Sequence, residues 1–134
     1  MKLKEQVINL EIAKRLNELM PRRDGLFAYY GNAGKWSDAI VDMRMYETAD
    51  EDFRKHKLLP AHTVSELGEI LPNGLEYIIT TSKAINNWIC LCEHIEGVLR
   101  KTTHVVFAYT EANARGKMLI YLLKNNLIKP IDER

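Results

Sequence analysis

The stretch Thr110–Lys129, TEANARGKMLIYLLKNNLIK, carries the strongest helix signal in the chain. Thr110 is a good N-cap, because its hydroxyl can accept a hydrogen bond from a backbone N–H of the first turn. Asn125 and Asn126 tolerate the left-handed conformation that ends a helix, and Pro130 forbids continuation. The sequence therefore predicts a helix that runs from the threonine to the asparagine pair and covers the apolar face of the strands before it.

This helix is apolar over most of its circumference, because two apolar sets share it. At about 100° per residue, one face carries Ala112, Gly116, Leu119, Ile120, Leu123 and Leu127. A second set on the flank and back contains Ala114, Met118, Tyr121 and Leu122. We expect a sheet against the Leu119–Leu123 face, and a second helix or a second copy of the chain against Met118, Tyr121 and Leu122. Gly116 lowers helix propensity by about 1 kcal/mol relative to alanine, which indicates close packing of the helix on the sheet.

Length and composition are those of an ordinary globular protein. The 134 residues, 46% hydrophobic and 28% charged, predict a single domain over residues 1–134. A formal net charge of +1 gives no general attraction to nucleic acid or acidic lipid. No apolar run approaches the roughly 20 residues that span a bilayer, and the N-terminus lacks the apolar core of a signal peptide. We therefore expect a cytoplasmic protein with no membrane partner.

The first half of the chain combines a helix with strand candidates. Asn9 has the chemistry of an N-cap for a helix over Leu10–Met20, which Pro21 ends. The aromatic stretch Leu26–Tyr30, LFAYY, predicts a strand, and the GNAGKWS that follows predicts a loop. Ala39–Tyr46 is compatible with a strand that pairs back on LFAYY and with a short helix capped by serine.

The second half predicts a short helix and a run of strands. Thr63–Glu66 is a capping box, which opens a helix with buried leucine and isoleucine side chains. The preceding stretch Glu47–Lys57 is the most polar of the chain and predicts an exposed loop. Closely spaced strand candidates follow at Leu75–Thr81, Asn87–His94 and Thr103–Tyr109. Their short connections favour an antiparallel meander, and Trp88–Cys92, apolar on both faces, is typical of a central strand.

Together these elements predict the α+β class. We expect one antiparallel sheet of about four or five strands, covered on one face by the Leu10–Met20 and Thr110–Asn126 helices.

The order of four segments resembles a group of small proteins encoded in bacteriophages and prophages. The segments are NLEIAKRLNEL, LFAYYGN, AHTVSELGEILPNG and TEANARGKMLIYLLKNNLI. The likeness covers most of the chain outside Lys35–Lys57. The group has no assigned activity, so the resemblance implies a mobile-element context and adds no chemistry.

Cys90, Cys92 and His94 are the residues that come nearest to a chemical motif. They alternate onto one strand face with Trp88, and a Cys-x-Cys with a histidine can begin a zinc site. Same-face residues on a strand are about 6.5–7 Å apart, however, so both sulfurs could share a metal only if the strand bent. Buried thiols are the favoured interpretation. A nucleophilic Cys92 would lie in mid-strand, away from the helix N-termini that lower a thiol pKa.

Neither cofactor binding nor a disulfide framework is predicted. GNAG at Gly31–Gly34 lacks the further glycine or the GK[ST] of a phosphate-binding loop, and a turn is the better interpretation. The two cysteines are too few for a disulfide scaffold.

Nucleic-acid binding is the alternative function. EIAKRL is common in the first helix of helix-turn-helix proteins, and the basic residues Arg22, Arg23, Arg54 and Lys57 are its candidate contacts. A helix-turn-helix needs a second helix after a short turn, whereas LFAYY predicts a strand there. Aromatic residues that could stack on bases are Tyr29, Tyr30 and Trp36.

We expect a non-enzymatic accessory protein of phage or prophage origin that acts through protein–protein contacts. The partner is a protein of unknown identity or a second copy of the chain, and the candidate interface is the Met118, Tyr121 and Leu122 side of the last helix. A small enzyme is the third class considered.

Overall fold

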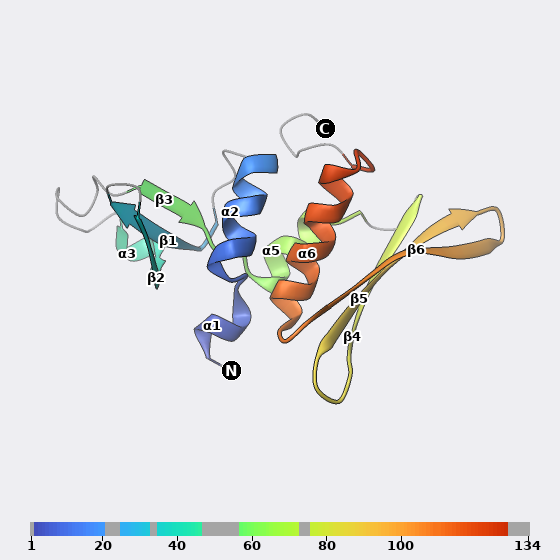
Figure 1. Ribbon diagram of the computed structural model, residues 1–134, viewed down its shortest axis with the longest axis horizontal. Helices are drawn as coiled ribbons and strands as arrows, with labels where there is room; N and C mark the ends of the chain where they lie inside the picture. The colour runs from blue at the N-terminus through green and yellow to red at the C-terminus, as the bar shows by residue number, and fades with distance from the viewer. Residues whose placement is uncertain (1, 21–24, 33–34, 47–56, 73–75, 129–134) are drawn as a thin grey trace.

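The structure is a computed structural model that describes residues 2–20, 25–32, 35–46, 57–72 and 76–128. Helices lie between two separate β-sheets (Figure 1). Each sheet has three antiparallel strands, in the orders β2-β1-β3 and β4-β5-β6. The α+β class is as the sequence predicts, but the prediction of one sheet of four or five strands is wrong.

The helices begin where the sequence places side-chain caps. They are α1 (Leu3–Gln6), α2 (Leu10–Leu19), α3 (Met43–Tyr46), α5 (Val64–Ile70) and α6 (Glu111–Lys124). Asn9 caps α2, because its Oδ1 accepts from the Ile12 N–H at 2.9 Å. Before α5, the Thr63 N–H donates to Glu66 and the Glu66 N–H donates back to the Thr63 hydroxyl. This reciprocal pair is the predicted capping box.

Both predicted ends of α6 are confirmed. Thr110 Oγ1 accepts from the Asn113 N–H at 3.1 Å. At the other end, Asn126 has φ of 57°, the left-handed conformation, and the Leu127 N–H donates to the Leu122 carbonyl at 2.9 Å. That bond spans the turn as in a Schellman motif, so the helix carbonyls keep partners where the helix stops.

The first sheet contains β1 (Phe27–Asn32), β2 (Lys35–Asp42) and β3 (Lys57–Pro60). The ambiguous segment Ala39–Tyr46 is a strand as far as Asp42, where it pairs with Phe27, and then becomes α3. GNAGKWS, predicted as a loop, is largely strand. Pairing with β1 continues down to Asn32 and Lys35, so only a short connection remains.

The strand β3 is missing from the sequence prediction. It pairs antiparallel with β1, with Tyr29 opposite Leu59. The start of β3 was not recognised in the sequence, because its first residue, Lys57, belongs to the polar stretch Glu47–Lys57. Residues 47–56 of that predicted loop lie outside the described residues.

The second sheet is the predicted meander. Its strands are β4 (Tyr77–Lys83), β5 (Trp88–Glu96) and β6 (Leu99–Ala108), with β5 in the centre. The connection between β5 and β6 is far shorter than expected, because Glu96 pairs with Leu99 across a two-residue turn. Gly97 has φ of +64° at the first turn position, as a type II′ hairpin turn requires. The strand β6 begins at Leu99 and not at Thr103 as predicted, because charged and polar residues at its start do not show a strand pattern.

The packing of α6 reverses the predicted faces. A Cβ at Gly116 would lie 2.7 Å from Ile12 Cγ2 and 2.8 Å from Ile8 Cγ2, so the glycine permits close contact with the α2 segment and not with the sheet. On the other side, the Tyr121 ring stacks on His104 of β6, with centroids 3.7 Å apart. The sheet therefore covers the face that we assigned to a second helix or a second copy.

The short segment Val7–Asn9 joins the parts of the fold. The Ile8 N–H donates to the His62 carbonyl at 3.1 Å, and the Ile8 carbonyl accepts from the Tyr29 hydroxyl at 2.7 Å. The Asn9 N–H donates to Asn113 Oδ1 of α6 at 2.8 Å. One extended segment thus contacts the first sheet, the start of α5 and the last helix.

In the chain, α5 stands between β3 of the first sheet and β4 of the second sheet. β3 pairs with β1, and α2 packs against this sheet and against α6. The chain then passes through α5, which packs on α6, before the meander begins on the far side (Figure 1). The helices consequently supply apolar surface to both sheets.

Candidate protein-binding surface

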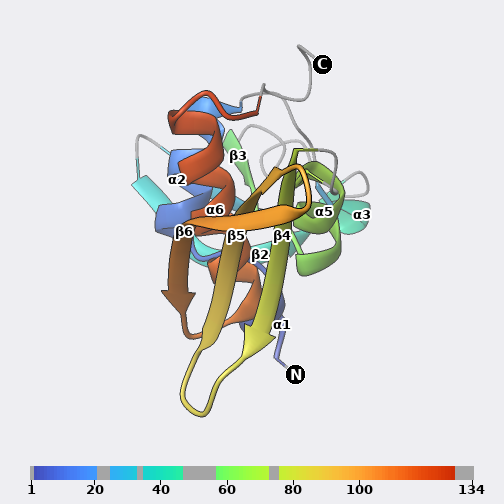
Figure 2. The same cartoon turned by 90° about the vertical axis from the view of Figure 1, so that its right-hand side faces the viewer.

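One face of the second sheet carries apolar side chains on the side away from α6. Successive strand residues point to opposite faces, so these side chains alternate with the buried cysteines of β5. Pairing places Ile89 beside Phe107 and Leu91 beside Val105. We call this set the open face: Ile89, Leu91, Val105 and Phe107. Figure 2 looks onto this side of the sheet, with the helices behind the strands.

The open face is apolar and accessible to solvent. Phe107 is 55% exposed and Val105 is 37% exposed, and the two β5 residues are half-buried. Thr80 and Ser82 of β4 extend the face across the sheet, since they pair with those β5 residues. None of these side chains carries a charge, so the surface favours an apolar partner over a charged one.

More exposed apolar residues surround the same sheet. At the turns and strand ends lie Ile85, Val98, Leu99 and Tyr109. Among the described residues, the only large apolar side chains of comparable exposure elsewhere are Leu3 and Leu26. Exposed apolar area is therefore concentrated on the meander.

The cysteines are core residues, as the sequence analysis favoured. Cys90 and Cys92 are free thiols with no exposed surface, and they face α6. Burial raises the pKa of the Cys90 thiol to about 12 and raises that of Cys92 as well. A thiol that holds its proton so firmly is a poor nucleophile near neutral pH.

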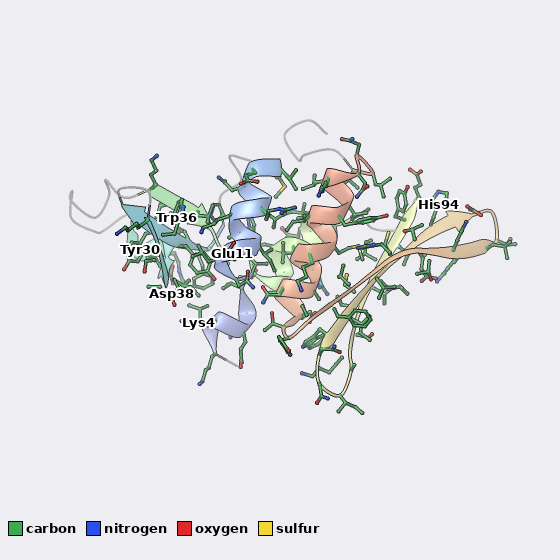
Figure 3. The ribbon with its side chains drawn as sticks, viewed as in Figure 1. Lys4, Glu11, Tyr30, Trp36, Asp38 and His94 are labelled. Atoms are coloured by element: carbon green, nitrogen blue, oxygen red, sulfur yellow. The ribbon has the colours of Figure 1, made fainter. Side chains whose placement is uncertain are left out.

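His94 lies away from the thiols in a polar setting of its own. Its ring contacts the carboxylates of Glu76, at 3.6 Å, and Glu96, at 3.3 Å, and it packs beside Tyr77. Figure 3 shows His94 near the end of the sheet that extends beyond the helices. In the part of the chain that the structure describes, no group of three or more histidine, cysteine or acidic residues is placed to hold a metal ion.

The predicted interface on α6 is part of the core. Met118 and Leu122 have no exposed surface, and Tyr121 is half-buried against His104. The prediction of a partner surface there is wrong, because Met118 and Leu122 are buried in the chain's own core and the Tyr121 ring stacks on His104.

The predicted nucleic-acid contacts stay a prediction. Arg22, Arg23 and Arg54 lie outside the described residues. Lys57 is exposed at the start of β3, in the first sheet, and the helices lie between this sheet and the second one (Figure 1). Of the aromatic candidates, Tyr29 is buried, whereas Tyr30 and Trp36 are half-buried.

The open face was overlooked in the sequence analysis, although part of its signal was visible. Trp88–Cys92 is apolar on both faces, and β5 is indeed the central strand. From the sequence we expected helices on one face of the sheet, but we did not ask which side chains the other face exposes. In the structure the helices cover only one of the two faces.

Comparison with protein-family models, curated proteins and solved structures finds no match to this chain. The resemblance to phage and prophage proteins therefore stays an expectation. Within the described residues, no helix has the length and apolar character needed to cross a membrane.

Proposed function

We propose that the protein is a non-enzymatic protein-binding module whose partner docks on the open face of the second sheet. The observation that carries the proposal is the exposure of Phe107 and Val105 on β6, beside the apolar Ile89 and Leu91 of the central strand. Apolar residues scattered singly over a surface need no explanation, but residues gathered on one face are characteristic of interaction sites.

Burial of this face would supply substantial binding energy. Full burial of a phenylalanine side chain is worth about 1.5–3 kcal/mol, and aromatic residues at the centre of an interface are frequent hot spots. Phe107 is more than half exposed, so a large part of that energy is available to a partner. The paired strands hold the face in shape, which limits the entropy lost on binding.

The partner that fits is a protein with a complementary apolar surface, including a second copy of this chain. Protein–protein contact is also the way in which we expect an accessory protein of phage or prophage origin to act. The exposed residues at the sheet's turns and end, including Tyr109, would lie at the rim of the contact.

Site-specific photo-crosslinking tests this function. A photoreactive phenylalanine analogue would replace Phe107 in cells that naturally carry the gene, and the matched control would replace Lys124, which is exposed on α6. We expect a discrete crosslinked product from position 107 and none from position 124. Mass spectrometry would then show whether the partner is a second copy or another protein.

A second substitution on the open face provides an internal check of the crosslinking. Val105→Ser should reduce crosslinking from position 107, because it places a polar group on the same apolar face. The absence of a crosslink from position 107, or equal crosslinking from both positions, would refute the proposal.

A further inference from the structure

The outer edge of β4 offers main-chain hydrogen-bonding groups to a ligand. Glu76 accepts from the Ile95 N–H at 2.9 Å, and the Ala84 N–H donates to Asn87 at 2.8 Å, which fixes the residues of β4 that bond to β5. Antiparallel pairs alternate, so Ile79 and Thr81 turn their N–H and C=O groups away from β5. Within the described chain, no other group bonds to these main-chain atoms.

A cavity lies beside this edge, between α5 and β4. Its volume is about 300 Å³, and it is lined by Gly68, Leu71, Pro72, Ile78, Ile79, Thr81 and Arg115. Most of the lining is apolar, and the guanidinium is its one charged group. A cavity of this size accommodates a large apolar side chain.

Gly68 leaves one wall of the cavity without a side chain. Apart from its chain neighbours and the backbone of α5 itself, a Cβ at this position would meet only Arg115 Nη1, at 2.7 Å. Glycine inside a helix costs about 1 kcal/mol relative to alanine. The short helix α5 carries this cost at the position that borders the cavity.

The Arg115 guanidinium is held by contacts at Nη2, but not all of its N–H donors have a good hydrogen-bond partner. Its Nη2 donates to Thr81 Oγ1 at 3.0 Å and pairs with Glu111 at 3.3 Å, whereas its Nη1 reaches the Val64 carbonyl only at 3.4 Å. The buried Nε has no hydrogen-bond partner among the described residues. Because the Nη1 contact is long, a ligand carbonyl near this end of the guanidinium would find available hydrogen-bonding capacity.

We propose that the β4 edge and this cavity form one site, which binds an extended peptide segment of a partner protein. The segment adds as a strand to Ile79 and Thr81 and places one apolar side chain in the cavity. Main-chain groups that repeat every second residue, about 6.5–7 Å apart, match an extended backbone. Strand addition with side chains seated in pockets is an established mode of peptide recognition.

The other edge of the same sheet is less suited to strand addition. The Phe107 carbonyl, which faces outward from β6, already accepts from Lys117 Nζ at 3.0 Å. In the first sheet, β3 is short and ends in Pro60, which has no N–H to donate. The β4 edge is also separate from the open face, because Ile79 and Thr81 point their side chains toward the helices. This proposal therefore stands independently of the open-face function.

Selection from a random peptide library displayed on phage, with the full chain as target, provides the probe. A synthetic peptide from the selection would then be titrated into isotope-labelled protein and followed by amide exchange. Without peptide, we expect the Ile79 and Thr81 amides to exchange faster than those of Thr80 and Ser82. With peptide, the Ile79 and Thr81 amides should become protected.

Two changes test the cavity and the strand pairing separately. Gly68→Leu fills the cavity from an exposed helix position and should weaken binding about tenfold or more, since the lost side-chain burial is worth 1.4 kcal/mol or more. N-methylation of the peptide at the residues that face β4 should weaken it similarly, without any change to the protein. Phe107→Ser on the open face is the matched control and should leave peptide affinity unchanged.

The proposal is overturned if no peptide is enriched. It is also overturned if Gly68→Leu and N-methylation leave affinity intact. Loss of binding in Phe107→Ser alone would assign the peptide to the open face instead.

Discussion

At the scale of single residues, the hydroxyl of Tyr29 is the clearest determinant of stability. It is buried and donates to the Ile8 carbonyl at 2.7 Å, which links the first sheet to the Val7–Asn9 segment. Tyr29→Phe leaves that buried carbonyl without this partner, so we expect a loss of about 1–3 kcal/mol in the free energy of unfolding. Urea denaturation measures this loss in the free energy of unfolding. The control is Tyr109→Phe at a ring that is 88% exposed, where little change is expected; equal losses in both variants would contradict this account.

The two thiols give a second prediction at this scale. Neither should react with a thiol reagent in the native protein near neutral pH, and both should react once the chain is unfolded. Rapid labelling of the native protein would contradict their burial.

The same thiols affect stability at alkaline pH. Burial raises the pKa of folded Cys90 from 9.0 to about 12, so above 9.0 the unfolded chain binds fewer protons than the folded one. Stability should therefore be unaffected by this group below 9.0 and fall as pH rises toward 12, by at most about 1.4 kcal/mol per pH unit. Cys90→Ala should make the decline shallower, and an unchanged slope would exclude this contribution.

Residue-level features were predictable from the sequence where the chemistry is local. Asn9, Thr63 and Thr110 are caps in the structure because a cap and its partner are only three residues apart. The bond between Tyr29 and Ile8 joins residues 21 apart and depends on the arrangement of whole elements. No local pattern signals a contact of that kind.

At the scale of elements, the two helical glycines should respond to alanine in opposite directions. Gly116→Ala places a methyl against the γ2 carbons of Ile8 and Ile12, both buried and β-branched. Overpacking of this kind costs about 1–3 kcal/mol, which exceeds the gain of about 1 kcal/mol in helix propensity. Gly68→Ala meets only the end of the Arg115 side chain, so its propensity gain should remain as a stabilisation of about 0.5–1 kcal/mol.

Thermal unfolding of the two glycine variants and of the parent chain shows whether each substitution raises or lowers stability. A stabilised Gly116→Ala would mean that α2 and α6 can separate slightly without loss. A destabilised Gly68→Ala would mean that the position of the Arg115 guanidinium matters more to the fold than helix propensity does.

The type of most elements was predictable, but the surfaces that they cover were not. The hydrophobic pattern of α6 showed two apolar faces without showing that α2 takes the Gly116 side and the sheet takes the Tyr121 side. The same limit applies to the open face. The alternation in Trp88–Cys92 marks a strand with two apolar faces, and only the structure shows that the cysteine face is buried while Val105 and Phe107 beside the other face are exposed.

At the scale of the whole molecule, the layered arrangement predicts that both sheets unfold in a single transition. They share no strand pairing, but α2 and α6 pack on one another and on different sheets, and Val7–Asn9 bonds across the layers. Unfolding of either sheet would expose the apolar helix surface on which the other sheet depends. Cooperative loss of both is therefore expected, as in other small single-core proteins.

The chain carries its own probes for this prediction, because each sheet contains one of its two tryptophans, Trp36 in β2 and Trp88 in β5. Trp88→Phe leaves a reporter in the first sheet, and Trp36→Phe leaves one in the second. In each variant, the tryptophan fluorescence transition in urea should coincide with the far-ultraviolet circular dichroism transition, which reports on the whole molecule. Fluorescence and dichroism midpoints that differ within one variant would show that the layers unfold separately. If the midpoint of the second sheet were the higher one, the open face would belong to a sheet that is stable without the first one.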